Sequence, residues 1–169
     1  MKTLFAFKKM FWMSAPFLLG VLMILLNQIP TSLMPYYHQS FPFVTGLIFY
    51  FGIFNPHILN IFLVFLLGLL MDAITTLPFG FYAFGFVFIY FMVSLFQSYL
   101  LEMVFSQLWL MYGVLFFCTD VIWAFLFFLS SGIWLSSGFW FVQFIFVVLT
   151  YPLFCRIYGF LNRKALEVQ

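Results

Sequence analysis

"FLLGLLMDAITTLPFGFYAFG", residues 65–85, consists of two apolar runs separated by a short break. The runs predict two apolar helices, and the break, "TTLPFG" at residues 75–80, predicts the turn that joins them. The stretch has one ionisable residue, Asp72. An ionised carboxylate within hydrocarbon costs about 3 kcal/mol on insertion scales. Something in the fold must therefore offset that cost.

The composition of the chain indicates a membrane protein. Its 169 residues are 67% hydrophobic and only 6% charged, whereas roughly a quarter of the residues of a soluble domain are charged. So few charged side chains cannot cover a water-facing surface, and lipid is expected to contact most of it. We therefore predict an all-α, polytopic membrane protein with a single transmembrane domain over residues 1–169.

The basic residues predict how the chain crosses the membrane. All six lie near the two ends, at Lys2, Lys8, Lys9, Arg156, Arg163 and Lys164. Because cytoplasmic flanks collect Lys and Arg, both termini are predicted to be cytoplasmic, and the number of crossings is then even. We expect a bundle of six transmembrane helices, at residues 11–29, 43–54, 58–76, 80–97, 105–129 and 139–161. The connections include outer loops at 30–42 and 130–138 and a cytoplasmic turn at 97–102.

Asp72 and its neighbours form the first candidate site. The hydroxyl groups of Thr75 and Thr76 and the amides near Gly80 are close in sequence, and a helix N-terminus stabilises a nearby anion. In this interpretation Asp72 caps the hairpin. Two other roles for Asp72 stay open: it shapes a groove for another helix or a ligand, or it belongs to a proton or ion path. Gly68 precedes Asp72 by one helical turn, so both share a face that another helix can approach closely. Other glycines that suggest close approaches are Gly46, Gly52, Gly80, Gly85 and Gly113.

Asp120 is the second acid within a predicted helix. No Lys or Arg lies within a span to pair with either acid, except Arg156 near the cytoplasmic boundary. Asp120 is therefore expected either to be protonated or to share a hydrogen bond between helices. The candidate partners in the sequence are Thr119, Gln107 and Gln143.

The sequence lacks the patterns that indicate an enzyme. It has neither an HExxH zinc motif nor a glycine-rich phosphate loop. His38 and His57 fall on opposite sides of the membrane in the predicted topology, so they cannot share a metal ion. Cys118 and Cys155 lie in apolar stretches and are interpreted as small core residues. We predict no catalytic residue, no metal and no cofactor, and six terminal cations do not form a nucleic-acid-binding patch.

A longer pattern continues from the third predicted helix into the fourth. It comprises Gly-Leu-Leu-x-Asp, a small polar pair, Pro-x-Gly and an alanine. These positions are Gly68, Leu69, Leu70, Asp72, Thr75, Thr76, Pro78, Phe79, Gly80 and Ala83. The pattern resembles that of the rod shape-determining protein MreD family. The chain departs from that family at three positions. Asn55 stands where the family commonly has Arg, Thr76 replaces a common Gly, and Phe79 replaces Leu.

The resemblance implies a non-enzymatic component of the bacterial cell-wall elongation machinery in the inner (cytoplasmic) membrane. Such a protein would bind the single transmembrane helix of MreC. It would help couple MreB filaments to peptidoglycan synthesis by RodA and its transpeptidase partner, and so regulate cell shape.

The family is also similar in fold to the S components of energy-coupling-factor vitamin transporters, and vitamin capture is therefore the alternative function. Short loops and few polar residues favour the scaffold, because packing and a few hydrogen bonds drive lateral helix docking.

Overall fold

The computed structural model describes residues 2–26, 43–75, 79–132 and 137–166. All regular secondary structure within these residues is helical, in seven helices without a strand. The all-α prediction is therefore confirmed. The predicted outer loop at 30–42, which includes His38, lies outside the described residues, as do Thr76 and Pro78.

Six of the seven helices correspond to the six predicted ones. The helices are α1 (Lys2–Leu26), α2 (Val44–Phe54), α3 (Ile61–Ile74), α4 (Phe81–Leu95), α5 (Gln97–Glu102), α6 (Phe105–Ser131) and α7 (Ser137–Leu166). α1 and α7 extend beyond the predicted apolar limits, because Lys and Arg are good helix formers and continue a helix into the polar flank. α3 begins later than expected, because the Asn60 side chain caps it and accepts a hydrogen bond from Leu63 N at 3.0 Å.

The prediction of a simple turn at residues 97–102 is wrong, because these residues form α5. The stretch "QSYLLE" contains neither Gly nor Pro, so nothing prevents helical structure from resuming after the bend at Phe96. The side chain of Gln97 donates a hydrogen bond to Ile53 O, near the end of α2, at 2.9 Å. The corner between α4 and α5 is thereby attached to α2.

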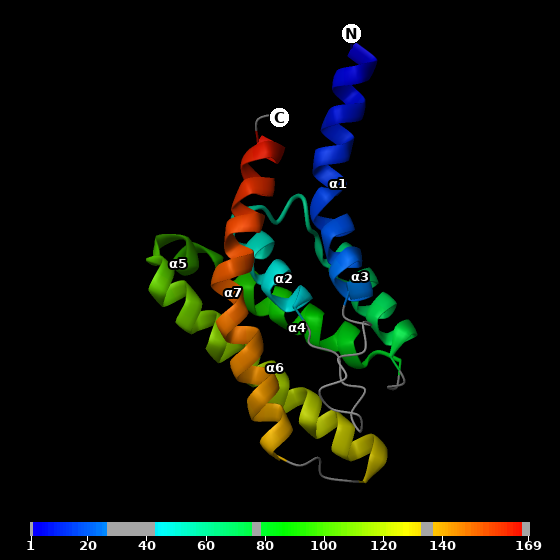
Figure 1. Cartoon of the computed structure of the whole chain (residues 1–169), viewed down its shortest axis with the longest axis vertical. Coiled ribbons are helices and arrows are strands. Elements are labelled where there is room, and N and C mark those ends of the chain that lie inside the picture. The colour runs from blue at the N-terminus through cyan, green and yellow to red at the C-terminus, as the bar shows by residue number, and fades with distance from the viewer. Residues whose placement is uncertain (1, 27–42, 76–78, 133–136, 167–169) are drawn as a thin grey trace.

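α2 lies inside the bundle, where it packs against α1, α4 and α7 (Figure 1). Nine of its eleven residues are buried. A helix of this length rises about 16 Å, which is roughly half the thickness of the hydrocarbon layer of a bilayer. The predicted helix at 43–54 therefore exists, but it is a buried core helix.

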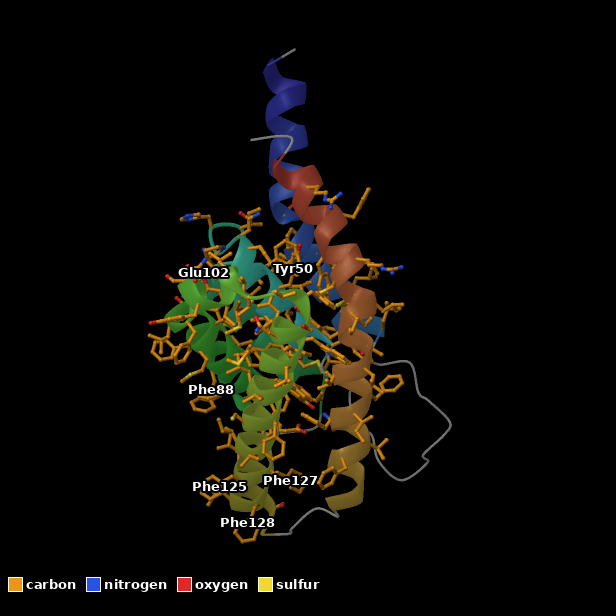
Figure 2. All side chains as sticks on the ribbon, turned by 90° about the vertical axis from the view of Figure 1, so that its left-hand side faces the viewer. Tyr50, Phe88, Glu102, Phe125, Phe127 and Phe128 are labelled. Atoms are coloured by element: carbon orange, nitrogen blue, oxygen red, sulfur yellow. The ribbon has the colours of Figure 1, made fainter. Side chains whose placement is uncertain are left out.

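Two helices are long and apolar enough to cross a membrane, namely α6 and residues 141–160 of α7. α1, α2, α3 and α4 contain shorter apolar helical stretches. Figure 2 shows Glu102 about half-way along the molecule, and Phe125, Phe127 and Phe128 near its lower end, where α6 ends. The exposed side chains along α6 include Leu110, Val114, Phe117, Val121 and Phe125. An apolar outer surface of this extent indicates contact with lipid or with another protein.

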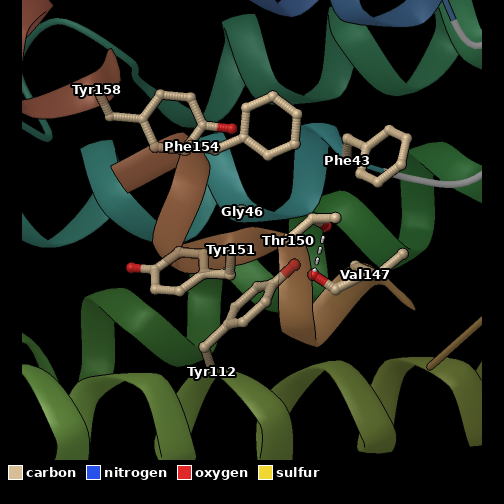
Figure 3. Close-up of a pocket in the computed structure, with 8 residues that line it drawn as sticks. All are labelled: Phe43, Gly46, Tyr112, Val147, Thr150, Tyr151, Phe154 and Tyr158. Carbon is tan, nitrogen blue, oxygen red and sulfur yellow. Dashed lines mark hydrogen bonds between the residues drawn. The ribbon is translucent and has the colours of Figure 1, made fainter. Parts of the chain in front are cut away.

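The junction of α2, α6 and α7 is packed with aromatic rings (Figure 3). The rings of Tyr112 and Tyr151 stack with their centroids 4.3 Å apart. The hydroxyl groups of Tyr112 and Thr45 share a hydrogen bond of 2.9 Å, which satisfies both polar atoms within the core. The side chains at this junction leave no room for a ligand between them. The junction therefore holds three helices together.

Candidate functional site

Asp72, in the last turn of α3, binds the N-terminal end of α4. Its Oδ1 accepts a hydrogen bond from Tyr82 N at 2.7 Å, and its Oδ2 accepts hydrogen bonds from Gly80 N at 2.9 Å and Ala83 N at 3.3 Å. The residue is only 2% exposed. The carboxylate thus meets the amides that have no partner within α4, at the positive end of the helix dipole. The predicted bonding to amides near Gly80 is confirmed, and we call this arrangement the α3–α4 staple.

Gly68 allows the two helices to meet closely enough for the staple to form. A methyl group on Gly68 would lie 2.8 Å from Ala83 N and closer still to Ala83 Cα. Ala83 is buried and has the smallest side chain that an L-residue can carry. The backbones therefore touch one helical turn before Asp72, which brings the carboxylate within reach of the α4 amides.

Gly80 contributes a backbone conformation to the turn. Its φ angle is +95°, in the left-handed region that side chains disfavour. A Cβ at Gly80 would meet nothing within 4 Å. The prediction that Gly80 marks a close approach is therefore wrong. A glycine is needed at this position because the left-handed φ angle forms the turn that directs the Gly80 amide at Asp72.

Thr75 does not contact the carboxylate in the way the sequence suggested. Its hydroxyl group donates to Met71 O at 3.0 Å and to Asp72 O at 3.4 Å, both of which are carbonyl groups of its own helix. A threonine hydroxyl readily bonds a carbonyl one turn back, and this competes with longer-range partners. Thr75 therefore completes the end of α3, and the staple depends on backbone amides.

Trp123 of α6 joins the staple, and the sequence did not single it out. Its Nε1 donates a hydrogen bond to Phe81 O in the first turn of α4 at 3.0 Å, and its ring meets that of Tyr82 edge-on at 5.1 Å. Gly85 makes room for the indole, because a methyl group there would lie 2.6 Å from Trp123 Cζ2. Gly85 was the only signal, and a glycine does not reveal which side chain approaches it.

We expect Gly85→Ala to destabilise the protein by displacing Trp123 from Phe81 O. Overpacking of a filled core typically costs about 1–3 kcal/mol, and the thermal midpoint in detergent measures the loss. In a Trp123→Phe background the same change should cost less, because the smaller ring leaves space for the methyl group. Equal losses in the two backgrounds would contradict this contact.

Asp120 lacks the partners that its sequence neighbourhood predicted. The residue is 6% exposed, and its Oδ1 has no hydrogen-bond partner among the described residues. Thr119 donates instead to Leu115 O at 2.9 Å, and Gln107 accepts from Val104 N at the start of α6 at 3.2 Å. Both side chains satisfy their own helix first. Gln143, buried on α7, does not supply a partner to Oδ1 either.

Asp120 lines a crevice between α6 and α7. We call this feature the α6–α7 crevice; its lining residues are Phe117, Asp120, Val121, Ala124, Phe141 and Phe144. Its volume is about 130 Å³. A single carboxyl group thus lies among apolar walls, on the surface of the α6–α7 pair. The structure brings Gly68, Asp72, Gly80 and Ala83 together and leaves Asp120 apart from them.

The candidate metal and thiol residues do not form a site. Within the described ranges, no group of three or more His, Cys, Asp or Glu side chains is placed to hold a metal ion. His57 is exposed. Cys155 is half-buried, but Cys118 is exposed on α6, so the prediction of a core position for Cys118 is wrong. When the surroundings of a helix are apolar, its outward and inward positions favour the same residue types, so an apolar sequence context does not place Cys118 in the core.

Comparison with known proteins does not assign this chain to a family: no family model matches it, and neither the curated proteins nor the solved structures provide a match.

Proposed function

We propose that this chain is a multi-pass, non-enzymatic scaffold of the bacterial inner membrane, similar to MreD. In this role it binds the single transmembrane helix of an MreC-like protein. Through that protein it acts on the wall-elongation machinery, with MreB filaments on the cytoplasmic side and RodA with its transpeptidase as more distant partners.

The exposed surface supports the membrane part of the proposal. α6 and most of α7 carry apolar side chains outward. The first turn of α1 and the last turn of α7 lie at the same end of the molecule (Figure 1), as an even number of crossings requires. The basic residues belong to this same end, which supports assigning it to the cytoplasmic side under the positive-inside rule. α2 can be shorter than the bilayer because other helices surround it and few of its residues need contact with lipid.

One observation carries the proposal most directly. Four positions of the MreD-like pattern, Gly68, Asp72, Gly80 and Ala83, converge on the α3–α4 staple. The pattern is therefore a set of residues that act together in one structural feature, which supports the resemblance. The staple fixes the angle and spacing of two helices, as a scaffold with a defined lateral surface requires.

The geometry of Asp72 favours a structural role over a proton or ion path. Both carboxylate oxygens accept backbone hydrogen bonds, and the residue is almost completely buried. A transported ion would have to displace amides that cap α4. Asp72 is therefore proposed to shape the partner surface through the hairpin.

The alternative of vitamin capture is less well supported. Small-molecule sites usually have volumes of roughly 300–1,000 Å³ and several convergent polar groups. The α6–α7 crevice holds about 130 Å³ and has one polar side chain in its lining. The aromatic junction of Figure 3 has no space that would admit a molecule as large as water.

Co-purification tests the proposed function. The affinity-tagged chain, extracted in a mild detergent, is expected to retain the co-expressed MreC-like protein and not an unrelated single-span protein. In a strain depleted of the native gene, loss of rod shape should accompany loss of that complex. Normal cell shape after depletion, or retention of a vitamin in place of the partner helix, would contradict the proposal and support the alternative. The neighbouring genes separate the two functions with little effort. Genes for wall elongation would support the scaffold, and genes for an energising ATPase would support vitamin capture.

A further inference from the structure

We infer that the α6–α7 crevice is the site where the partner's transmembrane helix docks, with a hydrogen-bond donor of that helix inserted against Asp120. This inference rests on the proposed function and makes it more specific, because it names the surface and the chemistry of contact. The donor is a side chain such as Ser, Thr, Asn, Gln, Lys or Arg at the middle of the partner helix.

The first step is the depth of Asp120. It lies near the middle of a 27-residue helix, so the ends of the helix are roughly 16 Å and 22 Å away. A short aspartate side chain cannot reach the interface from this depth, as a long Lys or Arg side chain can. Neither bulk water nor a lipid headgroup is available at the middle of a bilayer. A hydrogen-bond partner for the Asp120 carboxyl group at this depth is therefore expected to come from protein.

The second step is that none of the described residues provides that partner. Thr119 and Gln107 are bonded within α6, and Oδ1 is without a partner in the described parts of the structure. Arg156 lies on α7, but it is about 18 Å further along that helix than Phe144, which lines the crevice. A buried polar atom without a partner is costly, and such atoms are uncommon unless something else supplies the bond.

The third step is the shape of the crevice. Its volume of about 130 Å³ is several times the ~10–15 Å³ that a cavity needs on this measure to hold one water molecule. This space accommodates the polar head of one side chain. Ala124 lies one turn after Asp120 on the same face, and a small residue there allows another helix to come close. Phe117, Val121 and Phe141 are exposed and provide apolar contact around the acid.

The fourth step connects this crevice to the staple. Trp123, within one turn of Asp120, is hydrogen-bonded to Phe81 O at the start of α4. The start of α4, which belongs to the staple, is thereby tied to α6. The Asp72 carboxylate of the staple already accepts three backbone hydrogen bonds, so it is not free for a partner. This separation gives the two acids different functions, with Asp72 maintaining the bundle and Asp120 binding the partner.

Partner retention by Asp120 variants provides the first measurement. Asp120→Leu is expected to lower recovery of the MreC-like helix about tenfold, in line with the 1–2 kcal/mol of an interhelical hydrogen bond. Its thermal midpoint should equal or exceed that of the unchanged protein, because an unsatisfied buried acid is removed. Asp120→Asn should retain more partner than the leucine variant, because the amide still offers an oxygen acceptor.

Site-specific crosslinking provides the second measurement and its matched control. Benzoylphenylalanine at Phe141, which is 62% exposed beside the crevice, is expected to crosslink to the partner helix. The same residue at Phe62 of α3, which is 65% exposed, should not. Full recovery of the partner by Asp120→Leu, or crosslinking from Phe62 and not from Phe141, would overturn the docking site while leaving the proposed function intact. No recovery of the partner by the unchanged protein would contradict both.

Discussion

Asp72→Leu is expected to insert into the membrane normally and then to lose the packed α3–α4 hairpin. The substitution leaves the amides of Gly80, Tyr82 and Ala83 without their acceptor. Each buried amide without a partner costs about 1–3 kcal/mol, so the combined loss for three amides is on the order of 3–9 kcal/mol. That is a large part of the 5–15 kcal/mol that stabilises a typical domain. Insertion should continue because leucine is more apolar than aspartate.

Three measurements check this result: the amount of protein in the membrane fraction, the thermal midpoint in detergent and the recovery of the proposed MreC-like partner. We expect the first to be unchanged and the other two to fall. Asp72→Asn should give an intermediate midpoint, because its amide oxygen still accepts hydrogen bonds while its NH₂ group faces donors.

The same substitution at the other acid is the matched control. Asp120→Leu removes a carboxylate whose Oδ1 has no described partner, so it should not lower the midpoint. If Asp72→Leu melted like the unchanged protein, the staple would not be a source of stability, and its relation to the proposed function would be lost.

Gly68→Ala is expected to separate α3 from α4, although it adds only one methyl group. That methyl group would lie 2.8 Å from Ala83 N and meet the Ala83 backbone, which cannot rotate away as a side chain does. The helices must move apart, and the hydrogen bond from Ala83 N to Asp72, already 3.3 Å, would lengthen beyond useful range. Overpacking alone costs about 1–3 kcal/mol, and weakening of the staple adds to it.

Gly113→Ala is the matched control, since Gly113 is also a buried helical glycine. A methyl group there would meet Val148 at 3.7 Å, an ordinary van der Waals distance, so the prediction of a close approach at Gly113 is wrong. The change should be neutral or stabilise by up to about 1 kcal/mol, because alanine favours the helix over glycine. We therefore expect Gly68→Ala to lower the thermal midpoint and Gly113→Ala to leave it unchanged or raise it. A similar loss at both positions would show that glycine matters for helix flexibility and not for backbone contact.

Contacts between residues close together in the sequence were predictable, and contacts between distant residues were not. Every donor to Asp72 lies within eleven residues of it, so the apolar run, the acid and the turn sufficed to anticipate a capped hairpin. Thr75 was assigned to the wrong acceptor, because a carbonyl of its own helix lay nearer than the carboxylate. The contact from Trp123 to Phe81 joins residues 42 positions apart, and no local pattern encodes it.

From the sequence alone came the helical class, the approximate limits of six helices and the hairpin around Asp72, because these depend on apolar runs, turn residues and neighbouring donors. Only the tertiary structure decided that α2 is buried, that Cys118 is exposed, and that Oδ1 of Asp120 has no partner in the described part of the chain. The physical reason is the same in each case. In a protein that exposes many large apolar side chains, hydrophobicity alone does not distinguish an inward position from an outward one. Only the packing of distant helices then determines which face of each helix meets protein.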